Sequence, residues 1–212
     1  MKLASYIFTF LLFISCSSTK LTQSWKNNEY NNFHPKKILI LGVTNNQTTR
    51  KIYEKKLTEQ LENRAIIANE SFLLFNNSFT NLKQTEENVQ MQIEKLLNNG
   101  FDSILISAVK GYDEKVAINK DIFNSDYYLR CFDNYYYINQ ELYFNRNYYE
   151  KYKVYHIEIS LYNLSNNTTK SLVWKGYYDI VNPQKVRFAI KDVVKAIIKS
   201  LEEEKLIPIL NS

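Results

Sequence analysis

The clearest pattern in the chain is a run of apolar residues between Lys37 and Thr44, where Ile, Leu and Val follow one another almost without polar interruption. A strand that lacks a polar face must be covered on both sides. Such strands lie in the middle of a sheet, with helices packed above and below it. We therefore expect residues 37–44 to form the central strand of an α/β domain.

Helical and strand patterns alternate after this central strand. Apolar residues spaced three and four apart predict a helix over 50–63 and a second helix that begins after Thr85. Glu54 falls among lysines on the outer side of the first helix, which predicts a solvated face. Short apolar runs at 65–68 and 101–109 predict two further buried strands, so the order to this point is βαβαβ.

The last part of the chain has the pattern of a hairpin and a helix. Apolar and polar residues alternate from 155 to 161 and from 172 to 180, with turn residues between the two runs. Apolar residues then recur at helical spacing at Val186, Ile190, Val193, Ile197 and Leu201. The predicted fold class is α/β: βαβαβ followed by an antiparallel hairpin and a C-terminal helix, with one mixed sheet flanked by helices.

A polar segment without a clean period, at about 113–151, separates the third buried strand from the hairpin. It is rich in tyrosine: ten of the chain's 17 tyrosines fall between positions 127 and 155. Tyrosine is enriched in interfaces because it offers a large rigid surface with a polar tip, and its ring also stacks on sugars. Base-composition bias and ordinary strand-face tyrosines are the alternative explanation. The candidate contact residues are Tyr135, Tyr148 and Tyr149.

The amino terminus combines a basic residue with a short apolar run that ends at a cysteine. Lys2 gives a positive start, and the apolar run over 6–14 has the length of a signal-peptide core, shorter than the roughly 20 residues that span a bilayer. The run ends in Ile14-Ser15-Cys16, which resembles the lipobox of bacterial lipoproteins. The resemblance implies that residues 1–15 are a signal peptide and that Cys16 carries acyl chains such as palmitate. An ordinary secretory signal with an incidental cysteine is the alternative.

Residues 16–36 are polar and rich in Asn, and we expect them to form a tether between the lipid and a single domain over 37–212. Ser17 is not the Asp that retains lipoproteins at the inner membrane of well-studied Gram-negative bacteria. No acidic export signal follows Cys16 either. The resemblance therefore implies an outer-membrane lipoprotein that faces the periplasm.

Composition narrows the classes of function. The net charge is +5, but the basic residues are scattered among 22 acidic ones. Nucleic-acid binding usually needs a clustered basic face, so we expect no nucleic-acid partner. With two histidines, and with Cys131 as the only cysteine after Cys16, a transition-metal site is poorly supported. A phosphate-binding glycine loop and a nucleophile elbow are both missing, so we expect no catalytic residues, no metal and no cofactor.

The loop after the central strand is a candidate ligand site. It follows the carboxyl end of that strand, where ligands bind in open α/β sheets. Its Asn and Thr side chains are suited to hold a small anion at the start of the next helix. Helix capping in a solvated loop is the plainer explanation. The candidate residues are Thr44, Asn45, Asn46 and Thr48.

Three short motifs accompany this order of elements: Ser24-Trp25-Lys26 before the first strand, Arg50 at the start of the first helix, and Val173-Trp174 in the hairpin. Together with the element order, they resemble a family of small uncharacterised bacterial envelope lipoproteins. The α/β domain of this family is similar to the N-terminal domain of TolB and to the lipoproteins LpoB and CsgG. The tyrosine-rich segment departs from the compact pattern of the family.

The anchor, the resemblance and the missing catalytic constellation predict a membrane-anchored, non-catalytic interaction lipoprotein. It would serve the assembly or maintenance of the bacterial cell envelope by binding an unidentified envelope protein or wall component. The alternative is a sugar- or peptide-binding lipoprotein, or an enzyme that acts on wall material. That alternative predicts a deep pocket with converging carboxylates. The candidates are Asp113, Glu114, Asp121 and Asp133.

Overall fold

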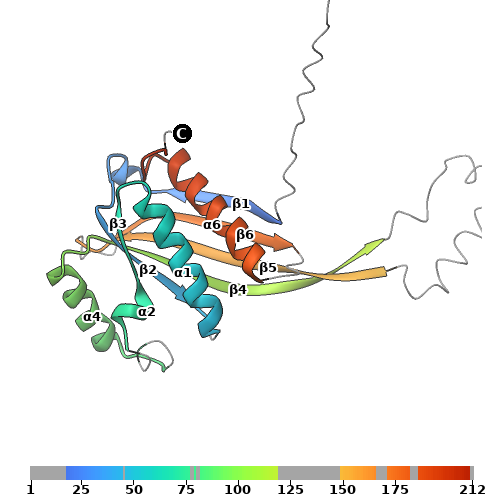
Figure 1. Ribbon diagram of the computed structural model, residues 1–212, viewed down its shortest axis with the longest axis horizontal. Helices are drawn as coiled ribbons and strands as arrows, with labels where there is room; N and C mark the ends of the chain where they lie inside the picture. Colours follow the sequence, from blue (N-terminus) through green and yellow to red (C-terminus); the bar gives the residue numbers. More distant parts are fainter. Residues whose placement is uncertain are drawn as a thin grey trace, which may run out of the picture.

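The computed structural model describes residues 18–44, 46–76, 79, 82–118, 149–165, 171–181 and 186–210. Within these ranges the fold is one mixed sheet of six strands with four α-helices (Figure 1). The strands are β1 (Thr19–Lys26), β2 (Lys37–Val43), β3 (Ile67–Glu70), β4 (Ser103–Ile118), β5 (Tyr149–Asn163) and β6 (Leu172–Val181). The helices are α1 (Gln47–Glu62), α2 (Ser71–Leu74), α4 (Glu86–Asn98) and α6 (Val186–Glu203), with a 3-10 turn η1 (Asn28–Tyr30).

The sheet has the strand order β1-β6-β5-β4-β2-β3. β2 pairs in parallel with β3 and β4, whereas β4–β5, β5–β6 and β6–β1 are antiparallel. The parallel part is the expected βαβαβ unit, and β5–β6 is the expected hairpin, with α6 following it. The predicted α/β fold class, one mixed sheet flanked by helices, is confirmed.

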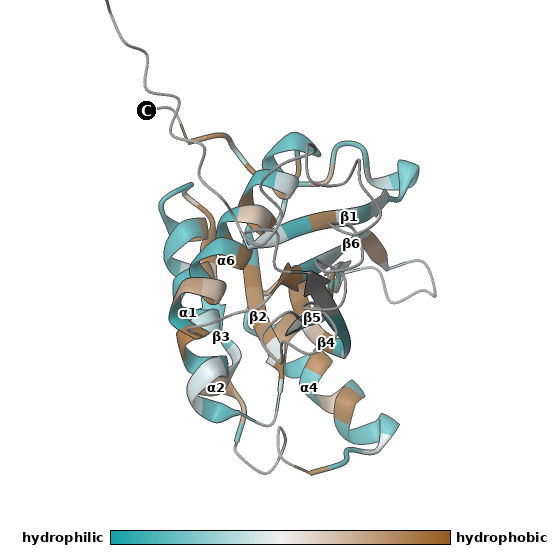
Figure 2. Ribbon diagram, turned by 90° about the vertical axis from the view of Figure 1, so that its right-hand side faces the viewer, coloured by the Kyte–Doolittle hydropathy of each residue, from teal (hydrophilic) through white to brown (hydrophobic). Residues whose placement is uncertain are grey.

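Strand β2 is covered on both faces, as its apolar sequence requires. Ile38 and Ile40 are buried in the larger core beneath α1 and α6, while Leu39 on the other face joins a smaller core with Leu96 and Phe101. Figure 2 shows α1 and α6 on one side of the sheet and α4 on the other, with hydrophobic residues concentrated along β2 between them. Burial on both faces makes β2 the strand around which the domain packs.

The helix ends follow local chemistry, with one correction. Thr85 caps α4 by accepting a hydrogen bond from the Asn88 amide, and Gly100 ends this helix at a positive φ of 80°. The first helix was expected to begin at Arg50, but α1 begins at Gln47. Asn46 provides the cap: its Oδ1 accepts a hydrogen bond of 2.9 Å from the Thr49 amide.

The predicted tether over 16–36 is wrong for most of its length. Residues Thr19–Lys26 form β1, which pairs with β6 at the edge of the sheet. Beyond β1, Tyr30 is buried in the larger core. The pattern was missed because an edge strand buries little of its surface: of the residues in β1 only Thr19 is buried, so no apolar alternation appears in the sequence.

The segment expected as an excursion from about 113 to 151 is also shorter at both ends. β4 continues to Ile118 and β5 begins at Tyr149, and these two residues pair with each other. The last residue of β4 that pairs with β2 is Ala108, and the first residue of β5 that pairs with β6 is Val154. Residues 114–118 and 149–153 therefore form a two-stranded ribbon that extends past the sheet (Figure 1).

Candidate functional site

A buried ion pair stands at the carboxyl end of β2. The Arg50 Nε lies 2.8 Å from Glu54 Oε1, and both side chains are almost completely buried. The same oxygen accepts hydrogen bonds from the Ser71 hydroxyl at 2.7 Å and from the Gly42 amide at 2.9 Å. The prediction that Glu54 lies on a solvated helix face is wrong, because these four groups tie α1 to β2 and to the start of α2.

An apolar cavity of about 320 Å³ lies beside this ion pair, between the first turns of α1 and α6 and above β2, β4, β5 and β6. Its apolar wall includes Ile157, Ile180, Val186, Ala189, Ile190 and Val193. Val43 and Val109 also line it, and each keeps 52% of its surface exposed. An open cavity with an exposed apolar rim is suited to receive an apolar group from another molecule.

The most buried polar groups of the cavity wall are engaged by other side chains. The Tyr53 hydroxyl shares a short hydrogen bond with the Ser107 hydroxyl. Burial raises the pKa of Tyr53 well above its usual value of 10.0, so this hydroxyl stays protonated at any physiological pH. Arg50 is held by Glu54 and by the Ser71 hydroxyl, which accepts from the guanidinium at 2.6 Å. These hydrogen bonds hold the side chains of the cavity wall in place.

The candidate residues of the ligand loop differ in their surroundings. Thr44 lines the cavity and accepts a hydrogen bond of 3.2 Å from the Asn46 amide. Asn46 is the helix cap, Thr48 is exposed, and Asn45 lies outside the described residues. Thr49, in the first turn of α1, lines the cavity as well. The sequence indicated the position of the loop, but it did not indicate the apolar surroundings of the loop.

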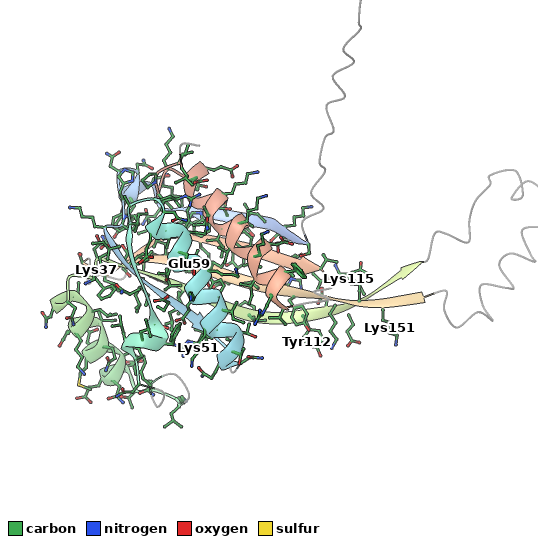
Figure 3. The ribbon with its side chains drawn as sticks, viewed as in Figure 1. Lys37, Lys51, Glu59, Tyr112, Lys115 and Lys151 are labelled. Carbon is green, nitrogen blue, oxygen red and sulfur yellow. The ribbon has the colours of Figure 1, made fainter. Side chains whose placement is uncertain are left out.

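Residues 109–113 of β4 lead from the rim of the cavity into the ribbon. Tyr112 stacks beside Tyr155 with ring centroids 5.7 Å apart, and the Lys153 ammonium lies 4.4 Å from the Tyr112 centroid. In Figure 3, Tyr112 lies where the ribbon begins, and Lys115 and Lys151 lie on the ribbon. Tyr155 also packs against the larger core, so its cross-strand contact with Tyr112 joins the start of the ribbon to the domain.

The tyrosine contact residues fall largely outside the described part of the chain. Tyr135 and Tyr148 lie outside it, as does the side chain of Tyr149, whose backbone pairs with Ile118 at the end of the ribbon. The lipid-attachment residue Cys16 also lies outside the described residues. The contact role of the tyrosines and the acylation of Cys16 therefore stay predictions from the sequence.

The candidate carboxylates do not meet within the described residues. Asp113 Oδ2 lies 3.4 Å from His156 Nε2, whereas Glu114 pairs with Lys153 at 3.6 Å. Neighbouring residues of a strand point to opposite faces, so these two carboxylates face away from each other. Asp121 and Asp133 lie outside the described residues.

His156 is held between two carboxylates at the base of the ribbon. Its Nδ1 lies 2.7 Å from Asp179 Oδ1, and Asp113 approaches its other ring nitrogen. The hydrogen bond to Asp179, followed by the negative charge of both carboxylates, raises the pKa of His156 above its usual 6.5. The cluster joins β4, β5 and β6 at the point where β6 ends.

We expect Asp179→Asn to lower the pKa of His156. Because the folded-state pKa is raised, the interaction stabilises the fold fully below the unfolded pKa of about 6.5 and is lost as pH rises through the folded value. The variant should therefore be destabilised most in mildly acidic solution. An NMR titration of the imidazole signals measures the shift, and His34, the other histidine, provides the internal comparison. An unchanged His156 titration would contradict the assignment.

The described residues include neither a metal-binding cluster nor a helix suited to cross a membrane. Among them, no group of three or more His, Cys, Asp or Glu side chains is arranged to hold a metal ion. No helix in the described ranges is both long enough and apolar enough to span a bilayer.

Comparisons with known proteins give similarity of fold at a low level. No family model matches the chain, and no curated protein matches its sequence. The PelC dodecamer from Paraburkholderia phytofirmans is 10% identical with a TM-score of 0.40, covering 88% of this chain and 95% of that one. The lipoprotein GNA1162 from Neisseria meningitidis is 10% identical with a TM-score of 0.42, covering 80% of this chain and 99% of that one. Similarity at this level carries no functional argument.

Proposed function

We propose that the chain is a membrane-anchored, non-catalytic interaction lipoprotein of the bacterial cell envelope, held at the outer membrane by acyl chains on Cys16 and facing the periplasm. Its contact surface consists of Val43, Val109 and the apolar cavity beside them. The partner is an envelope protein that inserts an apolar side chain into this cavity. The observation that carries the proposal is the open cavity with its exposed apolar rim.

The hydrogen bonds of the buried polar groups favour a contact surface over a catalytic site. A catalytic site needs a nucleophile or a general base that is free to approach a substrate. In the cavity the Tyr53 and Ser107 hydroxyls bond to each other, and Arg50 is engaged by Glu54 and Ser71. What the cavity presents to an incoming group is mainly apolar surface, and burying such surface drives association.

The ribbon adds a second means of binding. Beyond Ala108 the outer edge of β4 has lost β2 as a partner, so its backbone groups are left without a neighbouring strand in the sheet. An edge of this kind accepts an added strand from another protein. This edge adjoins Val109, so a strand added there would bring its side chains to the mouth of the cavity.

Charged substitutions at the rim test the proposal. We expect Val43→Glu and Val109→Glu each to lower the yield of captured partner by about tenfold or more, since a buried contact of this kind contributes about 1.4 kcal/mol or more. Val89→Glu is the matched control, because Val89 on α4 is 41% exposed and lies away from the cavity. The yield is measured by photo-crosslinking in intact cells, followed by affinity capture from solubilised envelope.

The melting temperature separates binding from folding. Exposed substitutions usually change stability by less than about 0.5 kcal/mol, so all three variants should unfold near the temperature of the parent protein. Equal capture by Val109→Glu and Val89→Glu would remove the cavity as the contact surface. Turnover of a wall fragment by the purified protein, abolished by a rim substitution, would replace the proposal with the enzyme alternative.

A further inference from the structure

The chain is fixed to the domain two residues after the proposed lipid-attachment residue. The Ser18 hydroxyl donates a hydrogen bond of 3.0 Å to Asp192 Oδ2 on α6, and the Ser18 amide approaches the same oxygen at 3.4 Å. The Ser18 carbonyl accepts a hydrogen bond of 2.8 Å from the Val181 amide at the end of β6. Ser18 is therefore held by both α6 and β6.

This attachment limits how far the lipid can be from the domain. Cys16 precedes Ser18 by two residues, and a fully extended chain spans at most about 3.6 Å per residue. The Cys16 Cα atom therefore lies within about 7 Å of the Ser18 Cα atom, whatever the conformation of Ser17. If Cys16 carries acyl chains, the surface around Ser18 must lie against the bilayer.

That surface has the composition of a membrane-facing one. Phe188 lies one turn before Asp192 on the same face of α6, and 64% of its surface is exposed. Val181, whose amide bonds to Ser18, is 43% exposed. Arg187 and Lys191 are exposed and also lie one turn apart on α6. We call Val181, Arg187, Phe188 and Lys191 the anchor-side patch.

We propose that the anchor-side patch docks onto the bilayer that holds Cys16. Phe188 and Val181 enter the boundary between headgroups and acyl chains, and Arg187 and Lys191 bind lipid phosphates. Apolar residues flanked by basic ones on a helix face are typical of surfaces that lie in the membrane interface. The acyl chains supply the attachment, and the patch sets the orientation of the domain. The inference rests on the proposed function, because it requires the lipid on Cys16.

The test places an environment-sensitive fluorophore at the patch of the full-length, lipidated protein. Phe188→Cys is labelled in a Cys131→Ser background, in which acylated Cys16 does not react. The protein is reconstituted in vesicles of phosphatidylethanolamine and phosphatidylglycerol that contain doxyl-labelled lipid. We expect blue-shifted emission and quenching at position 188. Leu73→Cys on α2 is the matched control, since Leu73 is 67% exposed, and its label should report water.

The basic residues have a test of their own. In the labelled protein, Arg187→Glu with Lys191→Glu should reduce quenching at position 188 by at least about twofold in anionic vesicles, because repulsion replaces attraction at the headgroups. Lys51→Glu with Lys55→Glu is the control, because these two exposed lysines have the same spacing on α1. The control pair should leave the quenching unchanged.

The outcomes separate this inference from the function on which it rests. Labelling with radioactive palmitate first establishes whether Cys16 is acylated. An acylated protein whose label at position 188 is as solvent-exposed as the label at position 73 would overturn the docking, while anchoring would stand. Equal quenching at both positions would likewise count against a specific patch. A protein that takes up no palmitate at Cys16 would overturn the proposed function and this inference together.

Discussion

Replacing Glu54 with alanine is expected to lower the free energy of unfolding by about 3–5 kcal/mol, the usual cost of breaking a buried ion pair from one side. The Glu54 carboxylate accepts hydrogen bonds from Arg50, Ser71 and the Gly42 amide, and a further one of 3.1 Å from the Phe72 amide. Its removal leaves the Arg50 guanidinium buried without a counter-charge. Urea unfolding followed by circular dichroism measures the change.

Two comparisons make this result specific. Glu59→Ala removes an exposed carboxylate from the same helix and should change stability by less than about 0.5 kcal/mol. Replacing the pair together, Arg50→Met with Glu54→Leu, should recover much of the loss, because no unpaired charge then stays buried. If Glu54→Ala were no more harmful than Glu59→Ala, the network would not be a determinant of stability.

The second large effect is expected from Trp174→Ala, which should lower the free energy of unfolding by about 3–5 kcal/mol. Trp174 on β6 is completely buried in the core beneath α6. Its ring lies over Gly176, where an added Cβ atom would come within 2.6 Å of the Trp174 Cη2 atom and 2.9 Å of the Tyr178 Cε2 atom. Both rings occupy the space that a side chain at position 176 would need.

A double-mutant cycle tests this packing directly. Gly176→Ala alone should cost about 1–3 kcal/mol through overpacking, whereas in the Trp174→Ala background the same change should cost clearly less, because the ring that it strikes is gone. Trp174→Phe is the control that keeps most of the aromatic volume, and it should be milder than Trp174→Ala. Additive effects of the two substitutions would show that Gly176 is required for some other reason. All of these proteins are compared by thermal and urea unfolding.

The parts of the fold that the sequence predicted correctly are those whose partners are implied by a local pattern. The unbroken apolar run of β2 requires cover on both faces, and Leu39 and Ile40 are fully buried on opposite sides of it. The cap residue Thr85 acts within the first turn of its own helix. Such features need no knowledge of distant residues.

The errors concern residues whose environment depends on segments that are far away in the sequence. Glu54 resembles its exposed neighbours on α1 until Ser71 and Gly42 are brought against it. β1 shows little alternation because it is an edge strand. The outer parts of β4 and β5 lack apolar alternation because no described helix covers the ribbon, and contacts such as Lys153 with Glu114 and Tyr112 replace a core.

The sequence predicted where the candidate site lies, but it did not predict that the site is apolar. Sheet topology places a ligand loop after β2, and Thr44 does line the cavity there. The apolar nature of the cavity comes from Ile180 and Ile190, which lie more than a hundred residues further along the chain. Only the assembled sheet, with α6 laid across it, brings these side chains to the loop.

The hydrogen bonds of Ser18 have a consequence for how copies of the protein would meet their neighbours. With Ser17 as the only residue between an acylated Cys16 and Ser18, the domain would have little freedom to tumble or to move away from the lipid surface. Encounters would then reduce to lateral diffusion in a plane, with the ribbon held at a nearly constant angle. Part of the rotational freedom that association normally removes would already be lost, so a modest contact would suffice for a stable complex.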